Sequence, residues 1–343
     1  RGWTQDTLEE HRIGYAPPEE DQDEFIEELI DEYGSDTLLK TGLFLPGPTK
    51  PFFKDRVVFP YLKAGKPRYF TARKTETNDE DLGKYIKQLQ SKDYVADFID
   101  EPLWTYTSNQ TSTVIITEGM PDAITTAQHG YDVITPVTVQ YKEEHRGSVA
   151  EATQRYDEAV IINDAEENDA GEQGAQQMLE GLDKIRPKHR ADLIKKGELP
   201  LPEGQEKNDI EAHLRDHDEP HEELKGIVED GKTLFEERFE ELPEDQDTVS
   251  LSNYSHEILE CMQSVKRNAR GENEMLKTEY IKRIKKRIYA DQSDVNQHYR
   301  EEDENRDDPL QERKERLEEK RRERKERKRE QRKENLPDEG RLV

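Results

Sequence analysis

Strands and helices alternate through the middle of the chain, from residue 113 to residue 215. The pattern begins with the apolar run TVIIT, continues through a helical segment that ends at Gly130, and returns to strands in DVITP and AVIIN. Strands that alternate with helices predict a parallel sheet with helices on both faces. The continuous apolar runs fit strands that are buried on both sides. Residues 113–215 are therefore predicted to form an α/β domain.

The segments on either side of this domain have different patterns. We expect residues 1–112 to form a mixed α+β subdomain, with short helices near residues 4–13 and 23–34 and a basic hairpin over residues 55–73. Residues 216–297 have no convincing strand pattern, and their apolar spacing predicts a helical subdomain.

The last part of the chain, residues 298–343, is predicted to be a charged tail that is either helical or disordered. Residues 311–333 contain 13 Lys and Arg against 7 Glu. This composition is typical of a solvated helix with ion pairs at helical spacing. Binding of nucleic acid is the alternative interpretation of this run.

The acid content of the chain weakens any inference from two neighbouring carboxylates. The 343 residues include 80 Asp and Glu against 53 Lys and Arg, and the formal net charge is −27. A hydrated acidic surface is typical of proteins that work in concentrated salt. The predicted source is a salt-adapted archaeon or its virus, and an ordinary acidic protein with a basic tail is the alternative.

The sequence also bears on zinc and on cellular location. Cys261 is the only cysteine, which excludes an internal disulfide and a cysteine-rich zinc site, so we expect no zinc within this chain. The sequence contains no run of about 18 apolar residues, so no membrane helix is predicted. No signal peptide is recognisable. We expect a cytoplasmic protein, and we expect further residues upstream of Arg1.

Carboxylates follow two buried strands at the point where each strand ends. Glu118 comes directly after TVIIT, Asp164 and Glu166 come after AVIIN, and Asp209 and Glu211 follow the next unit. Ligands of open parallel sheets bind beyond the carboxyl ends of the strands. Carboxylates gathered there repel one another unless a cation lies between them. Oxygen ligands without cysteine favour Mg²⁺ or Mn²⁺, and this predicts phosphoryl chemistry.

Two glycines lie beside these acids in the sequence. Gly119 and Gly171 are predicted to let backbone or substrate approach closely. The other acids of the second segment are assigned to solvation, and they are Glu167, Asp169 and Glu172.

Three segments of this region resemble the TOPRIM domain, the metal-binding fold of bacterial-type DNA primases, topoisomerases and some nucleases. They read EGMPD from Glu118, NDAEENDAG from Asn163 and KNDIEAHL from Lys207. The usual pattern is Glu-Gly-x-x-Asp followed by two Asp-x-Asp pairs. Glu166 and Glu211 each stand where the second Asp of a pair is usual, which keeps the charge and lengthens the reach.

The flanking segments narrow the resemblance to the catalytic core of a DnaG-type primase, over about residues 1–295. The segment RGWTQDTLEEHRIGYAP resembles the start of that core, and KDRVVFPYLKAGKPRYFTARK resembles its basic hairpin. The segment GKYIK resembles its Lys-Tyr segment. Its closing helical subdomain resembles TEYIKRIKKRI. The order of the segments carries the resemblance. The family's zinc-binding module and helicase-binding domain are not recognisable here.

The resemblance implies a TOPRIM-type parallel sheet and a reaction. A primase makes a short RNA primer from ribonucleoside triphosphates on a single-stranded DNA template for replication, by metal-dependent nucleotidyl transfer. Glu118, Asp164 and Glu166 would be catalytic and would hold Mg²⁺ or Mn²⁺. The implied further metal ligands are Asp209 and Glu211, and Asp122 would support the acidic site.

Nucleic-acid binding is implied for basic residues around the hairpin. By the resemblance, Arg56, Arg73 and Lys84 would contact triphosphate or template backbone. Tyr69, Phe70 and Tyr85 are candidates to stack on bases. Packing within the hairpin core is the alternative for all three, and it is favoured for Phe70. The implied partners are single-stranded DNA, ribonucleoside triphosphates and the RNA primer, with a replicative helicase as a further candidate and no membrane.

Two other functions remain open. The first is a TOPRIM nuclease or other phosphotransferase, against which the basic hairpin and the lack of a visible topoisomerase tyrosine motif argue. The second is a primase-derived nucleic-acid-binding subunit that has lost synthesis. His145 is interpreted as a structural or surface residue because no second histidine is placed to share a metal with it. Cys261 and Met262 are assigned to a helical core.

Overall fold

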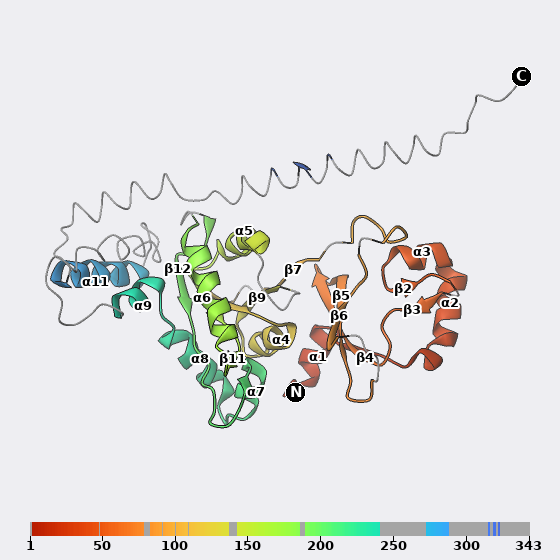
Figure 1. Ribbon diagram of the computed structural model, residues 1–343, viewed down its shortest axis with the longest axis horizontal. Helices are drawn as coiled ribbons and strands as arrows, with labels where there is room; N and C mark the ends of the chain where they lie inside the picture. The colour runs from red at the N-terminus through yellow and green to blue at the C-terminus, as the bar shows by residue number, and fades with distance from the viewer. Residues whose placement is uncertain are drawn as a thin grey trace, which may run out of the picture. The chain divides into compact units, whose positions relative to one another are not determined.

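The computed structural model describes most of the chain and gives it a mixed α/β structure (Figure 1). Two compact units interleave along the sequence: one comprises residues 1–141, 160–175 and 197–231, and the other comprises residues 142–159, 176–196 and 232–343. The described residues are 2–47, 49–78, 83–90, 92–99, 101–108, 110–136, 143–185, 189–240, 272–287, 315, 318, 319 and 322.

Short helices and a small ribbon precede the first sheet. These elements are α1 Gln5–Glu10, the 3-10 helix η1 Glu19–Asp21, α2 Asp23–Tyr33, α3 Ser35–Lys40, β2 Phe44–Leu45 and β3 Lys50–Pro51. Thr4 begins α1, and its hydroxyl accepts a hydrogen bond from the amide of Thr7. Gly34 ends α2 with a φ of 77°, a conformation that glycine adopts without strain. The two helices predicted near residues 4–13 and 23–34 are confirmed.

A four-stranded antiparallel sheet contains the predicted basic hairpin. Its strands, in the order β1-β4-β5-β6, are β1 Gly14–Ala16, β4 Arg56–Lys63, β5 Lys66–Lys74 and β6 Tyr85–Lys87. Lys63 pairs with Lys66, so Ala64 and Gly65 form a two-residue turn. Both turn residues have positive φ, at 51° and 70°, which is the geometry of the turns that suit tight hairpins. The sequence analysis did not predict β1 and β6.

The second sheet has five strands in the order β12-β10-β8-β9-β7, and β8 runs parallel to β9. The elements of this region are β7 Leu103–Tyr106, β8 Thr113–Thr117, α4 Met120–Gln128, β9 Asp132–Pro136, α5 Glu143–Thr153, β10 Glu158–Ile162, α6 Ala170–Asp183 and β12 Leu193–Lys196. Residues 114–116 and 159–162 have no exposed surface, which confirms the prediction of doubly buried strands. The edge strand β7 is antiparallel to β9, and neither β7 nor β12 was predicted.

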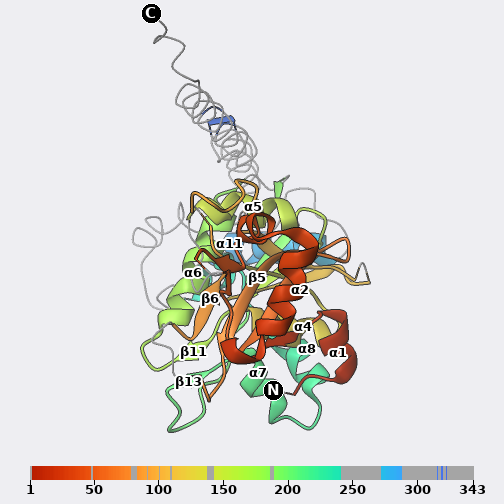
Figure 2. The ribbon, with the colours of Figure 1, turned by 90° about the vertical axis from the view of Figure 1, so that its right-hand side faces the viewer.

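Helices α7 and α8 follow a two-stranded ribbon in the first unit. The elements are β11 Ala165–Glu166, β13 Lys207–Asn208, α7 Ile210–Arg215 and α8 Pro220–Asp230. Figure 2 shows β11, β13 and α7 at the same end of the molecule. Leu214 of α7 and Leu224 of α8 pack with Ile115, Val160 and Ile162 of the sheet. The same hydrophobic cluster therefore fixes the helices relative to β8 and β10.

The described C-terminal part contains two further helices, α9 Leu234–Glu240 and α11 Glu272–Arg287. The ring of Tyr280 in α11 stacks on Phe235 in α9 with centroids 4.0 Å apart, and its hydroxyl lies 2.7 Å from the hydroxyl of Thr233. No strand lies in residues 216–240 or 272–287, in line with the predicted helical subdomain. Cys261, Met262 and most of the charged tail lie outside the described residues.

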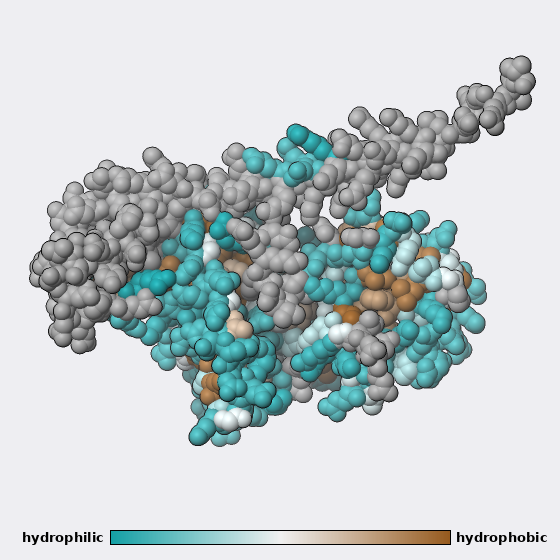
Figure 3. All heavy atoms as spheres, in the orientation of Figure 1, coloured by the Kyte–Doolittle hydropathy of each residue, from teal (hydrophilic) through white to brown (hydrophobic). Residues whose placement is uncertain are grey.

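The described surface in Figure 3 is mostly hydrophilic, as the acid content of the chain requires. Within the part of the chain that the structure describes, no helix combines the length and the apolar character needed to cross a membrane.

Candidate acidic active site

The end of β8 places Glu118 directly beyond a buried strand. Residues 114–117 have no exposed surface, whereas Glu118 is only half-buried. Gly119 then leads into α4, and a Cβ added there would meet the carboxylate of Asp122 at 3.0 Å. Gly119 thus lets the turn bring the side chain of Asp122 close to the end of β8, whereas the prediction was a close approach of backbone or substrate.

Asp164 follows β10 in the same way, and α6 is packed tightly against it. A side chain on Gly171 would overlap the carbonyl oxygen of Asp164. Asn163 also connects the two segments, because its Nδ2 donates to the carbonyl of Gly171 at 3.1 Å. The glycine that interrupts the acidic segment is therefore needed for the backbone of α6 to approach Asp164.

Lys207 joins the two acids of the second segment. It pairs with Glu166 across the β11–β13 ribbon, and its Nζ lies 2.7 Å from Oε1 of Glu166. The same Nζ forms an ion pair with Oδ2 of Asp164. The sequence analysis missed Lys207, although this residue opens the third segment quoted above.

The pKa values show that these groups share one electrostatic environment. Burial, and next the charge of Asp164, raise the pKa of Glu118 to about 7. Burial also raises the pKa of Asp164, although Lys207 opposes that shift. Burial alone would lower the pKa of Lys207, but its hydrogen bonds to Asp164 and Glu166 raise it above its ordinary value. One ammonium therefore offsets only part of the charge of three carboxylates.

The remaining predicted acids lie around the start of α7. Asp209 caps this helix, because its Oδ1 accepts from the amide of Ala212 at 2.7 Å, and its charge acts on Asp164. Glu211 is buried and pairs with Arg215 at 3.1 Å. Asp122, also buried, accepts from the amide of Glu211 at 3.4 Å. Asp122 therefore connects α4 to α7 beside the acidic residues.

The predicted basic residues occupy different environments. Arg73 and Tyr85 pair between β5 and β6, and the Arg73 guanidinium lies 5.9 Å from the Tyr85 ring centroid. The ammonium of Lys84 lies 6.0 Å from the same centroid. Arg56 is fully buried, and its Nη1 donates to the carbonyl of Gly83 at 3.2 Å. We call Arg73, Lys84 and Tyr85 the basic-aromatic patch.

The predictions for the aromatic residues of the hairpin have different outcomes in the structure. Tyr69 is only 1% exposed and packs with Phe59 and Trp104, so the suggestion that Tyr69 stacks on bases was wrong. Hydrophobic burial determines its position within the hairpin. Phe70 packs against the cluster of Phe53, Ala72 and Ile86, which confirms its predicted packing role. His145 is half-buried in α5.

Comparison with models of protein families finds no match, and comparison with curated proteins finds no relative. Solved structures do match. The catalytic core of DnaG has a TM-score of 0.59 at 17% identity, over 86% of this chain and 89% of that chain. A DnaG primase catalytic domain bound to single-stranded DNA has a TM-score of 0.58 at 16% identity, over 84% and 86% of the two chains.

The Aquifex aeolicus primase, solved with its zinc-binding and RNA polymerase domains, also matches. Its TM-score is 0.58 at 16% identity, and the match covers 86% of this chain but 66% of that longer chain. At these identities the likeness concerns the fold. The parallel sheet with flanking helices is the fold of a DnaG primase catalytic core.

Proposed function

We propose that this chain is the catalytic core of a DnaG-like DNA primase, which makes short RNA primers from ribonucleoside triphosphates on single-stranded DNA. One observation carries the proposal: Glu118 and Asp164 follow adjacent buried strands and interact with each other and with Lys207. This arrangement lies within a fold shared with primase cores. We assign residues 113–215 to a TOPRIM domain on the same grounds.

The acidic residues fit a divalent metal ion. Glu118, Asp164 and Glu166 offer carboxylate oxygens, the donors that Mg²⁺ and Mn²⁺ prefer, and Lys207 already provides a positive charge beside two of them. These three residues would hold the metal, with Asp209 and Glu211 as further ligands and Asp122 as support. When bound, the ion would offset charge on phosphate oxygens during an in-line displacement.

Lys207 has a role of its own in this proposal. Its ammonium bridges Asp164 and Glu166 across the ribbon, so it keeps two repelling carboxylates close together. This contact would hold both carboxylates in place while the site is without a nucleotide. The same ammonium is available to a triphosphate, because 45% of its side-chain surface is exposed.

The basic-aromatic patch would bind nucleotide or template. Arg73 and Lys84 would contact phosphates, and the half-buried Tyr85 ring would stack on a base. Arg56 would act indirectly, because its buried guanidinium holds the backbone of Gly83 next to Lys84. The other proposed partners are the RNA primer and a replicative helicase, and the proposed setting is DNA replication in concentrated salt.

Primer synthesis on single-stranded DNA tests the proposal. We would supply labelled ribonucleotides with Mg²⁺ or Mn²⁺ at low and molar KCl, and compare the wild type with Glu118→Gln and Asp164→Asn. Glu167→Gln is the matched control, since Glu167 is an exposed acid of the same segment. We expect metal-dependent RNA products from the wild type and the control, with a loss of about 100-fold or more in both site variants.

The other outcomes separate the alternatives. Template degradation that disappears in Glu118→Gln would indicate a nuclease. Binding of single-stranded DNA without any product at either salt would indicate a subunit that has lost synthesis.

A further inference from the structure

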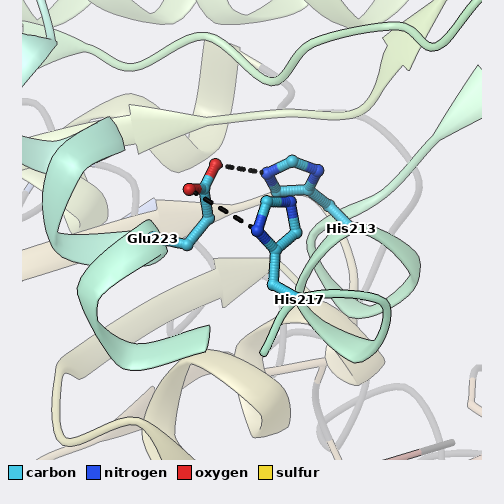
Figure 4. Close-up of side chains that lie close together, drawn as sticks. All are labelled: His213, His217 and Glu223. Atoms are coloured by element: carbon cyan, nitrogen blue, oxygen red, sulfur yellow. Dashed lines mark hydrogen bonds and ion pairs between the residues drawn. The ribbon is translucent and has the colours of Figure 1, made fainter. Parts of the chain in front are cut away.

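A second cluster of ligating side chains lies where α7 meets α8. Figure 4 shows His213, His217 and Glu223 pointing toward one another. Nε2 of His213 lies 2.8 Å from Oε1 of Glu223, and Nδ1 of His217 lies 3.6 Å from Oε2 of the same carboxylate. The ligand atoms of all three side chains lie within 4.8 Å of one another. We call these residues the His-His-Glu cluster.

The donor set differs from that of the acidic site. Two imidazole nitrogens with one carboxylate oxygen suit Zn²⁺ and similar transition metals, whereas Mg²⁺ prefers oxygen ligands. Four-coordinate Zn²⁺ with bonds of about 2.0–2.1 Å places its ligand atoms roughly 3.3 Å apart. The 2.8 Å separation is shorter than this value and the ligand atoms spread over as much as 4.8 Å, so the side chains would have to rotate to bind the ion. Three protein ligands leave the fourth position for water.

The fold holds these side chains close together. His213 lies in α7 and His217 lies one turn further on, just beyond the C-cap Asp216, so their ring centroids are 4.5 Å apart. Glu223 lies in the first turn of α8. His213 is buried, but 39% of the His217 side chain and 34% of the Glu223 side chain are exposed. A metal ion from solvent can therefore reach the cluster.

The hydrogen bonds of His213 favour a proton on Nε2, which faces Glu223, so metal binding requires the other tautomer. Binding through Nε2 requires the ring proton on Nδ1. That nitrogen lies 3.4 Å from Nδ2 of Asn208, which makes a much shorter hydrogen bond of 2.7 Å to the carbonyl of Pro200. A proton on Nδ1 would place two donors face to face, so Asn208 would lose this 3.4 Å contact and keep its bond to Pro200.

We propose that the His-His-Glu cluster is a Zn²⁺-type site that joins α7 to α8. This inference is independent of the proposed primase activity. It also departs from the expectation of no zinc within the chain, which rested on the shortage of cysteine. The consequence concerns α7: Asp209 caps this helix and Glu211 lies within it, so a metal at its C-terminal end would fix the element that positions both acids.

Zinc titration of the untagged full chain tests the proposal. The chain is first stripped with chelator, and 10 mM Mg²⁺ is then kept present so that oxygen-only sites are occupied. Calorimetry measures binding of Zn²⁺, and visible absorption of Co²⁺ reports four-coordinate geometry. The variants are His217→Asn and Glu223→Gln, and the control is His221→Asn, an exposed histidine of α8 outside the cluster.

We expect the wild type and His221→Asn to bind one Zn²⁺ and to melt at a higher temperature with it. The affinity should fall by about tenfold or more in each cluster variant, with circular dichroism unchanged. Failure of the wild type to bind Zn²⁺ stoichiometrically would overturn the proposal. Wild-type affinity in His217→Asn would do so too, and would leave the cluster as a His213–Glu223 contact with His217 beside it.

Discussion

Lys207 partly offsets the negative charge of the acidic site through its contacts with Asp164 and Glu166. Lys207 contacts Asp164 and Glu166 from a position 41 residues further along the chain than Glu166. The sequence analysis found the acids because each follows a buried strand. It missed Lys207 because nothing in the sequence shows that β13 pairs with β11. The role of Lys207 becomes clear only from its contacts, and the pairing of β11 with β13 creates these contacts.

Lys207→Met should destabilise the metal-free chain. Loss of the ammonium leaves Asp164 buried without its cation, and we expect a cost of about 1–2 kcal/mol, reduced because Lys207 is partly exposed. Mg²⁺ should restore a large part of this loss. Urea unfolding with and without Mg²⁺ measures both effects.

The control for this variant is Lys225→Met. Lys225 makes only exposed ion pairs, at 3.7 and 4.0 Å, so a change within about 0.5 kcal/mol is expected. Equal effects of the two substitutions would show that Lys207 has no special role.

Glu118 should make the stability of the metal-free chain depend on pH. Its folded pKa of about 7 lies above its ordinary value of 4.5, so the folded state binds the proton more tightly. Stability from this group is therefore present at low pH and is lost as the pH rises from about 4.5 to about 7. In Glu118→Gln, the decrease in the free energy of unfolding over this pH range should be smaller by about 1–2 kcal/mol.

Urea unfolding of the metal-free wild type and of Glu118→Gln at pH 5 and pH 8 measures the difference. Other groups titrate in both proteins, so only the difference between the two pH dependences is informative. Parallel pH dependences would contradict the shared electrostatic environment of Glu118 and Asp164.

At the scale of elements, the predictable parts are those with strong local patterns. The strands β8, β9 and β10 and the helices between them follow from apolar runs and glycines. The strand β12 escaped prediction because its sequence, LIKK, ends in two lysines. Both are buried and paired, Lys195 with Glu158 at 2.9 Å and Lys196 with Glu237 at 2.8 Å. These ion pairs allow two lysines to be buried in a strand, and their acidic partners lie far away in the sequence, where the local pattern does not show them.

The first turn of α6 cannot tolerate a side chain at Gly171. Because a Cβ there would overlap the carbonyl of Asp164, Gly171→Ala should push α6 and Asp164 apart. We expect a loss of about 1–3 kcal/mol in stability and of at least about tenfold in primer synthesis. Urea unfolding and the primer assay measure the two effects.

Gly226→Ala is the matched control for this helix glycine. Gly226 lies within α8, and a Cβ there meets nothing within 4 Å. Alanine should stabilise the helix by about 0.5–1 kcal/mol. A Gly171→Ala protein as active and stable as the wild type would disprove the close approach of α6.

The basic-aromatic patch at β5 and β6 should bind single-stranded DNA. Arg73→Ala and Lys84→Ala should each weaken binding and lower the slope of log affinity against log salt by about 0.7, because each removes one phosphate contact. Fluorescence anisotropy across a series of KCl concentrations gives the slope. Lys225→Ala, on α8, should leave the slope unchanged, and a patch variant that behaves like this control would place the DNA elsewhere.

At the scale of the whole molecule, the fold is similar to that of known proteins although the sequence identity is low. The chain shares the fold of primase cores at 14–17% identity, and it carries a formal net charge of −27. A strongly acidic protein repels nucleic acid in general, so the proposed binding would depend on local groups such as Arg73 and Lys84. The buried apolar strands belong to the shared fold, and the acids at their ends form the proposed site.

Template-directed synthesis is the most direct test of the primase proposal. The measurement is the yield of labelled RNA made on circular single-stranded DNA by the wild type, Asp164→Asn and Glu167→Gln, with Mg²⁺ present. The account predicts alkali-labile products that hybridise to the template, made by the wild type and Glu167→Gln and absent with Asp164→Asn. Products of equal yield from Asp164→Asn would contradict the assignment of the acidic site, and the absence of template-complementary RNA from the wild type would contradict the primase proposal itself.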